Sequence, residues 1–155
     1  MASEFNEKVA MDLKKWNDRY ILHIIDTCMW SRYTVSVFIM RKTLSEVINA
    51  LMKHWIGIFG VMQAVLTDNG GEFTSDEMRE VMSILNVRTC TTAGMSPFKN
   101  GLCERVHAIT DGMLTKLKEK CGRKNCLTLL CWANMAKNSL QMWNGFSSHQ
   151  LVFGT

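Results

Sequence analysis

The order in which strand-like and helix-like segments follow one another is the feature that most constrains the fold. Three strand-like segments come first, at 8–13, 20–27 and 33–40, each with alternating or β-branched residues. The short connection at 28–32 predicts that the second and third pair as a hairpin. Helical segments then alternate with further strands. This order predicts an α/β fold whose mixed sheet has helices on both faces.

Capping patterns predict where the first two helices begin. Thr43–Glu46 and Thr74–Glu77 both fit the Thr-x-x-Glu capping box. We expect these helices to end at Gly60 and Asn86, because both residue types tolerate left-handed backbone. The segment 61–67 between them is apolar on both faces, as is typical of a central buried strand.

The remaining chain predicts one more strand and two more helices. A fifth strand is expected at 87–91, followed by a polar loop at 92–101 that contains the one proline. Apolar residues at helical spacing predict a long helix over 102–120 and a last helix over 127–143. The tail after this helix is expected to be a loop.

Size and composition fit one globular domain. The chain has 155 residues, of which 47% are hydrophobic and 21% charged, an ordinary globular mixture. We interpret residues 1–4 as a leader, such as a remnant of an expression vector, and 5–155 as the domain. No apolar run reaches the roughly 18 residues of a membrane span, so we expect no membrane partner. The net charge of +4 permits an anionic partner without requiring one.

The cysteines predict a reducing environment. The chain has six, with no Cys-x-x-Cys pair and no preceding signal peptide. We interpret them as reduced thiols of an intracellular protein. A zinc site on Cys121, Cys126 and His149 is an alternative, although their spacing fits no familiar ligand pattern.

Three carboxylates are candidates for chemistry. Asp12 lies between apolar neighbours in a strand, where a charge is costly unless it is paired or binds a metal. Asp68 directly follows an apolar strand, where sheets of this kind bind ligands, but an Asp there also suits a turn. Glu104 lies in the first turn of the long predicted helix, where the helix dipole alone would favour it.

Together these carboxylates predict a metal site. They form an oxygen-rich donor set without a histidine cluster, which suits Mg²⁺ or Mn²⁺ rather than zinc. Two such ions activate the attacking oxygen and stabilise the leaving oxygen of a phosphodiester. The chain has no Gly-x-Ser-x-Gly nucleophile motif and no Gly-rich nucleotide loop. The pattern therefore favours metal-dependent phosphodiester chemistry.

The motifs around these residues resemble those of a known family. The stretch Leu66–Phe73 (LTDNGGEF) is similar to the second-aspartate motif of retroviral and LTR-retrotransposon integrases. Ser96–Arg105 (SPFKNGLCER) resembles their glutamate motif, and 35 residues separate Asp68 from Glu104, as in the D,D-35-E group. Three further segments are similar to the first-aspartate strand, the following hairpin and the closing segment of gypsy-like elements: 10–13, 26–33 and 145–154.

This resemblance implies both a fold and an activity. The fold would be RNase H-like, with a five-stranded mixed sheet of three antiparallel and two parallel strands. Asp12, Asp68 and Glu104 would be catalytic and would hold two Mg²⁺ (or Mn²⁺) ions. The partners would be double-stranded DNA, both element ends and target, and a second copy in a homodimer or larger oligomer. The reactions would be 3′-end processing and DNA strand transfer, with a nuclear site of action.

Residues beside the glutamate motif are candidates for DNA contact. They are Lys99, Asn100, Arg105 and His107, with a solvated surface or packing as the alternative interpretation. His107 stands where asparagine is frequent in the family, and Phe98 where glutamine is usual. These departures remove no predicted metal ligand, but they lie on the side expected to face DNA.

Two alternatives to an active integrase core remain open. One is a domesticated or decayed core that only binds DNA or self-associates, against which the three retained carboxylates argue. The other is an RNase H-like nuclease that cuts without joining, against which the glutamate motif on a helix after a long loop argues. Asp26 and Glu72 match no ligand position, so we expect neither to be catalytic.

Overall fold

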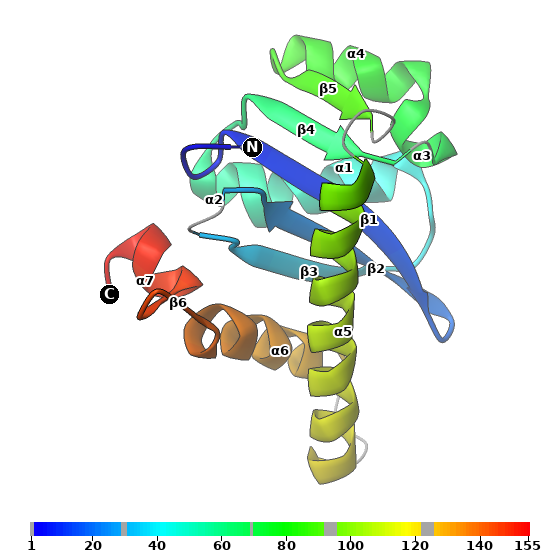
Figure 1. Ribbon diagram of the computed structural model, residues 1–155. Coiled ribbons are helices and arrows are strands. Elements are labelled where there is room, and N and C mark those ends of the chain that lie inside the picture. The colour runs from blue at the N-terminus through cyan, green and yellow to red at the C-terminus, as the bar shows by residue number, and fades with distance from the viewer. Residues whose placement is uncertain (1, 29–30, 69, 92–95, 122–125) are drawn as a thin grey trace.

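A five-stranded sheet forms the centre of the computed structural model, which describes residues 2–28, 31–68, 70–91, 96–121 and 126–155. Its strands are β1 (Lys8–Trp16), β2 (Arg19–Asp26), β3 (Thr34–Ile39), β4 (Ala64–Thr67) and β5 (Arg88–Thr91), in the order β3-β2-β1-β4-β5 (Figure 1). The β1–β2 and β2–β3 pairs are antiparallel, and the β1–β4 and β4–β5 pairs are parallel. The predicted mixed sheet is confirmed.

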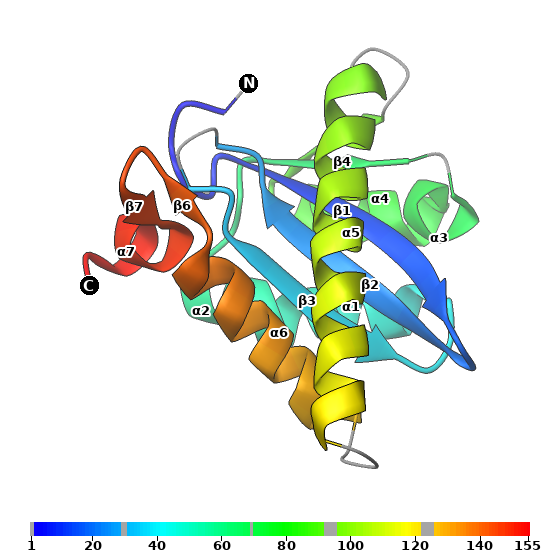
Figure 2. The same cartoon turned by 60° about the horizontal axis from the view of Figure 1, so that its bottom comes forward.

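Helices cover both faces of the sheet, as expected. One face carries α1 (Leu44–Leu51), the π-helical turn η1 (Met52–Ile56) and α2 (Gly57–Phe59), and the other carries α5 (Ser96–Cys121) and α6 (Cys126–Leu140) (Figures 1 and 2). The remaining elements are α3 (Gly71–Thr74), α4 (Asp76–Ile84), β6 (Met142–Trp143), β7 (Phe146–Ser147) and α7 (Ser148–Phe153). Within the described residues, no helix is both long and apolar enough to cross a membrane.

The alternation of β1 divides its side chains between two hydrophobic cores. Val9 and Met11 pack with α1 and η1, where Trp55 is fully buried. Ala10 faces the other way and packs against Val106 of α5. Because side chains of a strand alternate, Asp12 shares the α5 face with Ala10.

The predicted helix boundaries are partly confirmed. Gly60 and Asn86 adopt positive φ values of 84° and 56°, as expected of helix ends. Thr43 caps α1 by accepting from the Glu46 N–H at 3.5 Å, but the Glu46 carboxylate accepts from the Arg41 N–H instead of completing the box.

Several boundaries differ from the predictions, among them the end of β1, the start of β4 and the end of α6. The N-cap of α4 is Ser75, not Thr74, and its hydroxyl accepts from the Met78 N–H at 3.2 Å. The helix α5 begins at Ser96, where a loop was expected, because Pro97 lacks an N–H that the first turn does not need. The tail is not a loop: Ser147 and Gln150 form a reciprocal capping box that starts α7.

The structure describes only some of the cysteine side chains, so the predictions for the cysteines are tested only in part. Cys28, Cys90 and Cys131 are free thiols among the described residues. The side chains of Cys103, Cys121 and Cys126 lie outside the described part, and the zinc alternative lies there with them.

Two asparagines of α6 form hydrogen bonds with backbone N–H and carbonyl groups on the outer edge of β3. Asn138 accepts from the Thr34 N–H at 3.0 Å and donates to the Thr34 carbonyl at 2.7 Å. Asn134 makes the same pair of bonds with Ser36, at 2.9 and 2.7 Å. Residues four apart share one helix face, so α6 replaces the missing neighbouring strand. The edge is thereby closed to pairing with another chain.

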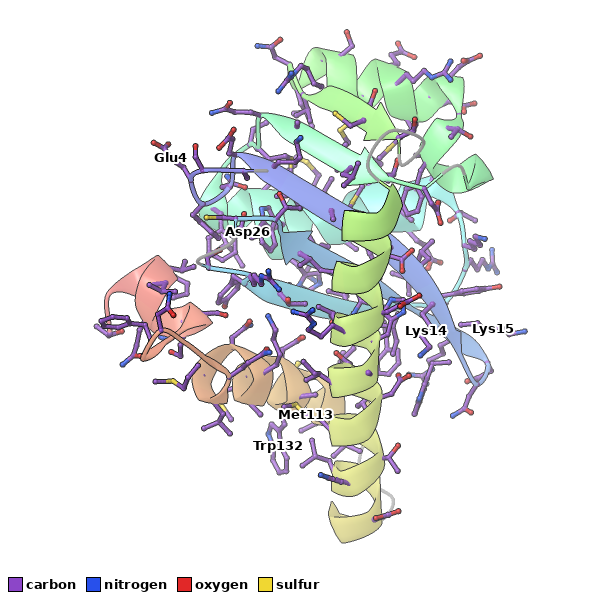
Figure 3. The ribbon with its side chains drawn as sticks, in the orientation of Figure 1. Glu4, Lys14, Lys15, Asp26, Met113 and Trp132 are labelled. Carbon is purple, nitrogen blue, oxygen red and sulfur yellow. The ribbon has the colours of Figure 1, made fainter. Side chains whose placement is uncertain are left out.

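Asp26 is a buried carboxyl at the end of β2. It pairs across the ladder with Val9, and in Figure 3 it lies to the left of Lys14, on the side of Glu4. The Asn6 N–H donates to its Oδ1 at 3.2 Å and the Ser31 hydroxyl donates to its Oδ2. Burial raises the pKa of Asp26 to about 7, despite these hydrogen bonds.

Asp26→Asn is expected to stabilise the protein at alkaline pH. With a folded pKa of about 7 and an ordinary value of 3.8, the neutral carboxyl favours folding, and this contribution declines as the pH rises from about 4 to 7. Asparagine keeps the acceptor for Asn6 and can donate to the Ser31 hydroxyl. We expect a gain of roughly 2–4 kcal/mol at pH 8, measured by urea unfolding.

The comparison with acidic pH gives the control for this prediction. Near pH 4 the two proteins should unfold with similar free energies, because the carboxyl is neutral in the folded state and only about half ionised in the unfolded chain. Asp18→Asn, at a side chain that is 84% exposed, should show no such pH-dependent gain. A difference between Asp26→Asn and wild type that stays constant from pH 4 to 8 would contradict the assignment.

Candidate active site

The sheet brings Asp12 and Asp68 onto neighbouring segments. The parallel pairing of β1 and β4 aligns Ala10 with Leu66, and each aspartate follows two residues later on its own chain segment. Asp68 directly follows the carboxyl end of β4, where α/β sheets bind ligands, beside the part of β1 that contains Asp12 and continues to Trp16. The first two predicted carboxylates therefore lie on adjacent segments.

Asp68 also has the structural role that its sequence position suggested. Its Oδ1 accepts from the Gly70 N–H at 2.9 Å, which forms a local turn before α3. The side chain is half-buried. This bond fixes one carboxylate oxygen and so orients the other.

Glu104 comes to this region on α5. Val106, two residues later, packs against Ala10, Ile25 and Leu66 and so anchors α5 over β1, β2 and β4. The side chain of Glu104 is exposed. Across the residues that the structure describes, no three His, Cys, Asp or Glu side chains lie close enough to hold one metal ion. The role of the three carboxylates as metal ligands therefore stays a prediction.

His107 contacts Asp12 directly. Its Nε2 lies 2.9 Å from the Asp12 Oδ2, with the two side chains 19% and 16% exposed. The distance is that of an ion pair, although the ring is not aligned for a hydrogen bond. His107 follows Glu104 by three residues, so both lie on the same side of α5. Its predicted DNA contact stays a prediction.

A second contact fixes α5 further along β1. The Lys14 ammonium donates to the Asp111 carboxylate, and each side chain is about one-third exposed. Lys14 lies two residues after Asp12, on the same face. An ion pair with this exposure adds little stability, but it sets the position of the helix that carries Glu104 and His107.

The other predicted DNA contacts are less defined. Arg105 is exposed, whereas the side chains of Phe98, Lys99 and Asn100 lie outside the described part of the structure. Arg32, which the sequence did not single out, has its pKa lowered by burial and by the nearby charge of Arg105. Arg32 and Arg105 lie far apart in the sequence, so no local motif predicts their proximity.

Comparison with known proteins identifies the family. Residues 3–97 match the model of the family described as "Integrase core domain". The chain belongs to this family. The matched part of this integrase core domain includes Asp12 and Asp68 and ends before Glu104.

Retroviral polyproteins are among its relatives. The integrase core domain is 30% identical over 103 residues to the Gag-Pro-Pol polyprotein of Mason-Pfizer monkey virus. These residues are 66% of this chain and 6% of that protein. It is 24% identical over 136 residues to the Pol polyprotein of Radiation murine leukemia virus (strain Kaplan), which covers 88% of this chain and 23% of the relative. The chain thus spans a small part of these relatives. The resemblance to retroviral integrases is confirmed, and the gypsy-like subtype stays a prediction.

Solved integrases share the fold. The HTLV-2 integrase catalytic core domain in complex with magnesium (dimeric form) superposes with a TM-score of 0.82 at 22% identity, over 94% of this chain and 95% of that one. A chain of the simian T-cell lymphotropic virus intasome in complex with PP2A regulatory subunit B56 gamma superposes with a TM-score of 0.85 at 23% identity. The superposition covers 98% of this chain and 56% of that one. The predicted RNase H-like fold is confirmed.

Proposed function

We propose that this chain is the catalytic core of an integrase, a polynucleotidyl transferase that carries out 3′-end processing and DNA strand transfer. The observation that carries the proposal is the placement of Asp12 and Asp68 on adjacent parallel segments of the sheet, beneath the helix that carries Glu104. Family membership supports it, because the motifs around Asp12 and Asp68 lie within the matched residues.

The donor set fits a divalent metal. Asp12, Asp68 and Glu104 offer only carboxylate oxygens, the ligands that Mg²⁺ and Mn²⁺ prefer. Asp12 lies in a strand with apolar neighbours, where a nearby cation lowers the cost of its charge. These three residues would hold two ions, which would polarise the phosphodiester and lower the pKa of the attacking water or hydroxyl. A solved core with the same fold is in complex with magnesium.

The chain's own residues hold the carboxylates in place. β1 pairs with β4 up to Ala10 and with β2 through Asp12 itself, so the backbone of Asp12 is held in the sheet. The Gly70 N–H orients the Asp68 carboxylate, and the packing of Val106 sets the position of Glu104. The attacking oxygen belongs to water in 3′-end processing and to a DNA 3′-hydroxyl in strand transfer, so no protein nucleophile is needed.

Double-stranded DNA is the proposed substrate, and the nucleus its site of action. The net charge of +4 and the exposed Arg105 beside Glu104 support an anionic partner. Lys99, Asn100 and His107 remain proposed contacts on the same part of α5.

Metal-dependent disintegration of a branched DNA tests the proposal. With the full-length protein and Mg²⁺ or Mn²⁺, we expect a joined product that EDTA abolishes. Cleavage without joining would instead favour the nuclease. Activity no higher than that of Asp68→Asn, together with retained DNA binding, would favour the non-catalytic DNA-binding core.

We also propose that the chain forms a homodimer through an apolar groove between α5 and α6. Figure 3 shows Met113 and Trp132 where these helices meet. The other residues that line the groove are Lys116, Leu117, Met135, Ala136 and Leu140. Trp132, Met135 and Leu140 are 39%, 63% and 73% exposed. Contiguous exposed apolar surface is typical of association sites.

Trp132→Glu is expected to convert the dimer into a monomer. A buried carboxylate at the centre of an apolar interface is costly, so the mass measured by sedimentation equilibrium should halve. Ile84→Glu on α4, at a side chain that is 77% exposed and lies outside the groove, is the matched control and should leave the dimer intact. Equal dissociation of both variants would refute this interface, as would a monomeric wild-type protein.

A further inference from the structure

A row of polar residues crosses three strands beside Asp12. The register of the sheet pairs Asp12 with His23 and His23 with Ser36. All three lie on the face that α5 and α6 cover, because the alternate residues Leu22 and Ile24 pack in the opposite core. His23 and Ser36 are only 0% and 2% exposed. Polar groups are rarely buried in this way without a partner or a role.

Contacts join this row to α5. The His23 Nδ1 lies 2.6 Å from the Ser36 Oγ, so strand β3 holds the imidazole in place. The ring of His107 rests on the ring of His23, with centroids 4.5 Å apart and planes tilted by 39°. The Nε2 of His107 then reaches Asp12 Oδ2 at 2.9 Å. The contacts form one path from β3 to the carboxylate.

His23 is suited to act as a support. Burial, together with the neighbouring His107, lowers its pKa to about 3. It is therefore neutral at physiological pH and presents an uncharged ring to His107. Its Nε2 has no hydrogen-bond partner among the described residues, so the Nδ1 bond to Ser36 and the ring contact determine its position.

We propose that His107 is a positioning residue that orients the Asp12 carboxylate for metal binding, with His23 and Ser36 bracing its ring. The proposal rests on the proposed function, because it assumes that Asp12 is a metal ligand. Contact at Oδ2 restricts the rotation of the Asp12 carboxylate. Groups that support metal-binding side chains in this way typically change metal affinity by about 10–100-fold.

Binding of Mn²⁺, followed by the loss of the free-ion EPR signal, tests this role without requiring activity. We expect His107→Leu in the full-length protein to weaken binding by about 10-fold or more. His107→Gln should restore most of the affinity, because its amide N–H can occupy the place of Nε2. His54→Leu, a half-buried histidine on η1, is the matched control and should bind like wild type.

A double-mutant cycle shows whether His107 acts through Asp12. In an Asp12→Asn background, His107→Leu should cause no further loss of affinity. Unchanged or tighter binding by His107→Leu would overturn the positioning role, and so would additive losses in the cycle. If His107→Leu unfolds, His107→Gln decides: binding as weak as that of Asp12→Asn overturns the proposal. Wild-type binding that does not depend on Asp12 would overturn the proposed function as well, which separates the two failures.

Discussion

Asp68→Asn is expected to lower the rate of strand transfer by about 10³-fold or more while leaving the fold intact. Asparagine retains the oxygen that accepts from the Gly70 N–H at 2.9 Å, so the turn after β4 is preserved. It lacks the negative charge that a divalent cation requires. Loss of about 4 kcal/mol of transition-state stabilisation corresponds to three powers of ten in rate. The measurement is the rate of joined product from a branched DNA substrate with Mg²⁺.

Companion variants make this result specific. Asp12→Asn and Glu104→Gln should cause similar losses, and combining them with Asp68→Asn should add little, because residues of one proposed metal site are expected to act as a unit. Asp18→Asn makes the same chemical change in the exposed turn between β1 and β2 and should retain wild-type activity. An Asp68→Asn protein within tenfold of wild type would show that Asp68 serves only the turn.

Asn138→Ala is expected to lower the free energy of unfolding by about 2–4 kcal/mol. The substitution removes the partners of the Thr34 N–H and carbonyl, which lie under α6 at the edge of the sheet. A buried backbone group left without a hydrogen bond costs roughly 1–3 kcal/mol. Urea unfolding followed by circular dichroism measures the change.

The neighbouring residue provides the control for this prediction. Ser139→Ala, one position along α6 at an exposed side chain, should change stability by less than about 0.5 kcal/mol. A loss below about 1 kcal/mol for Asn138→Ala would mean that water replaces the amide at the strand edge.

Local patterns explain which parts of the fold could be predicted. The strands β1 to β5 follow from alternation and apolar runs of the right length, and Asn86 ends its helix in the left-handed conformation as expected. The start of α5 was missed because Pro97 was taken to belong to a loop, although proline is also common in a first helical turn. The Ser147–Gln150 capping box was a local signal for α7 that could have been found.

By itself, the sequence determined the order of strands and helices along the chain. It also determined the positions of Asp12, Asp68 and Glu104 in their motifs, and the family that those motifs indicate. These properties depend on residues close together in the chain. The contact of His107 with Asp12 and the bond of Asn138 to Thr34, 104 residues away, were decided only by the tertiary structure. Such contacts depend on how α5 and α6 pack on the sheet, which no local pattern specifies. The same packing places the ring of the buried His23 against His107, which contacts the candidate metal ligand Asp12.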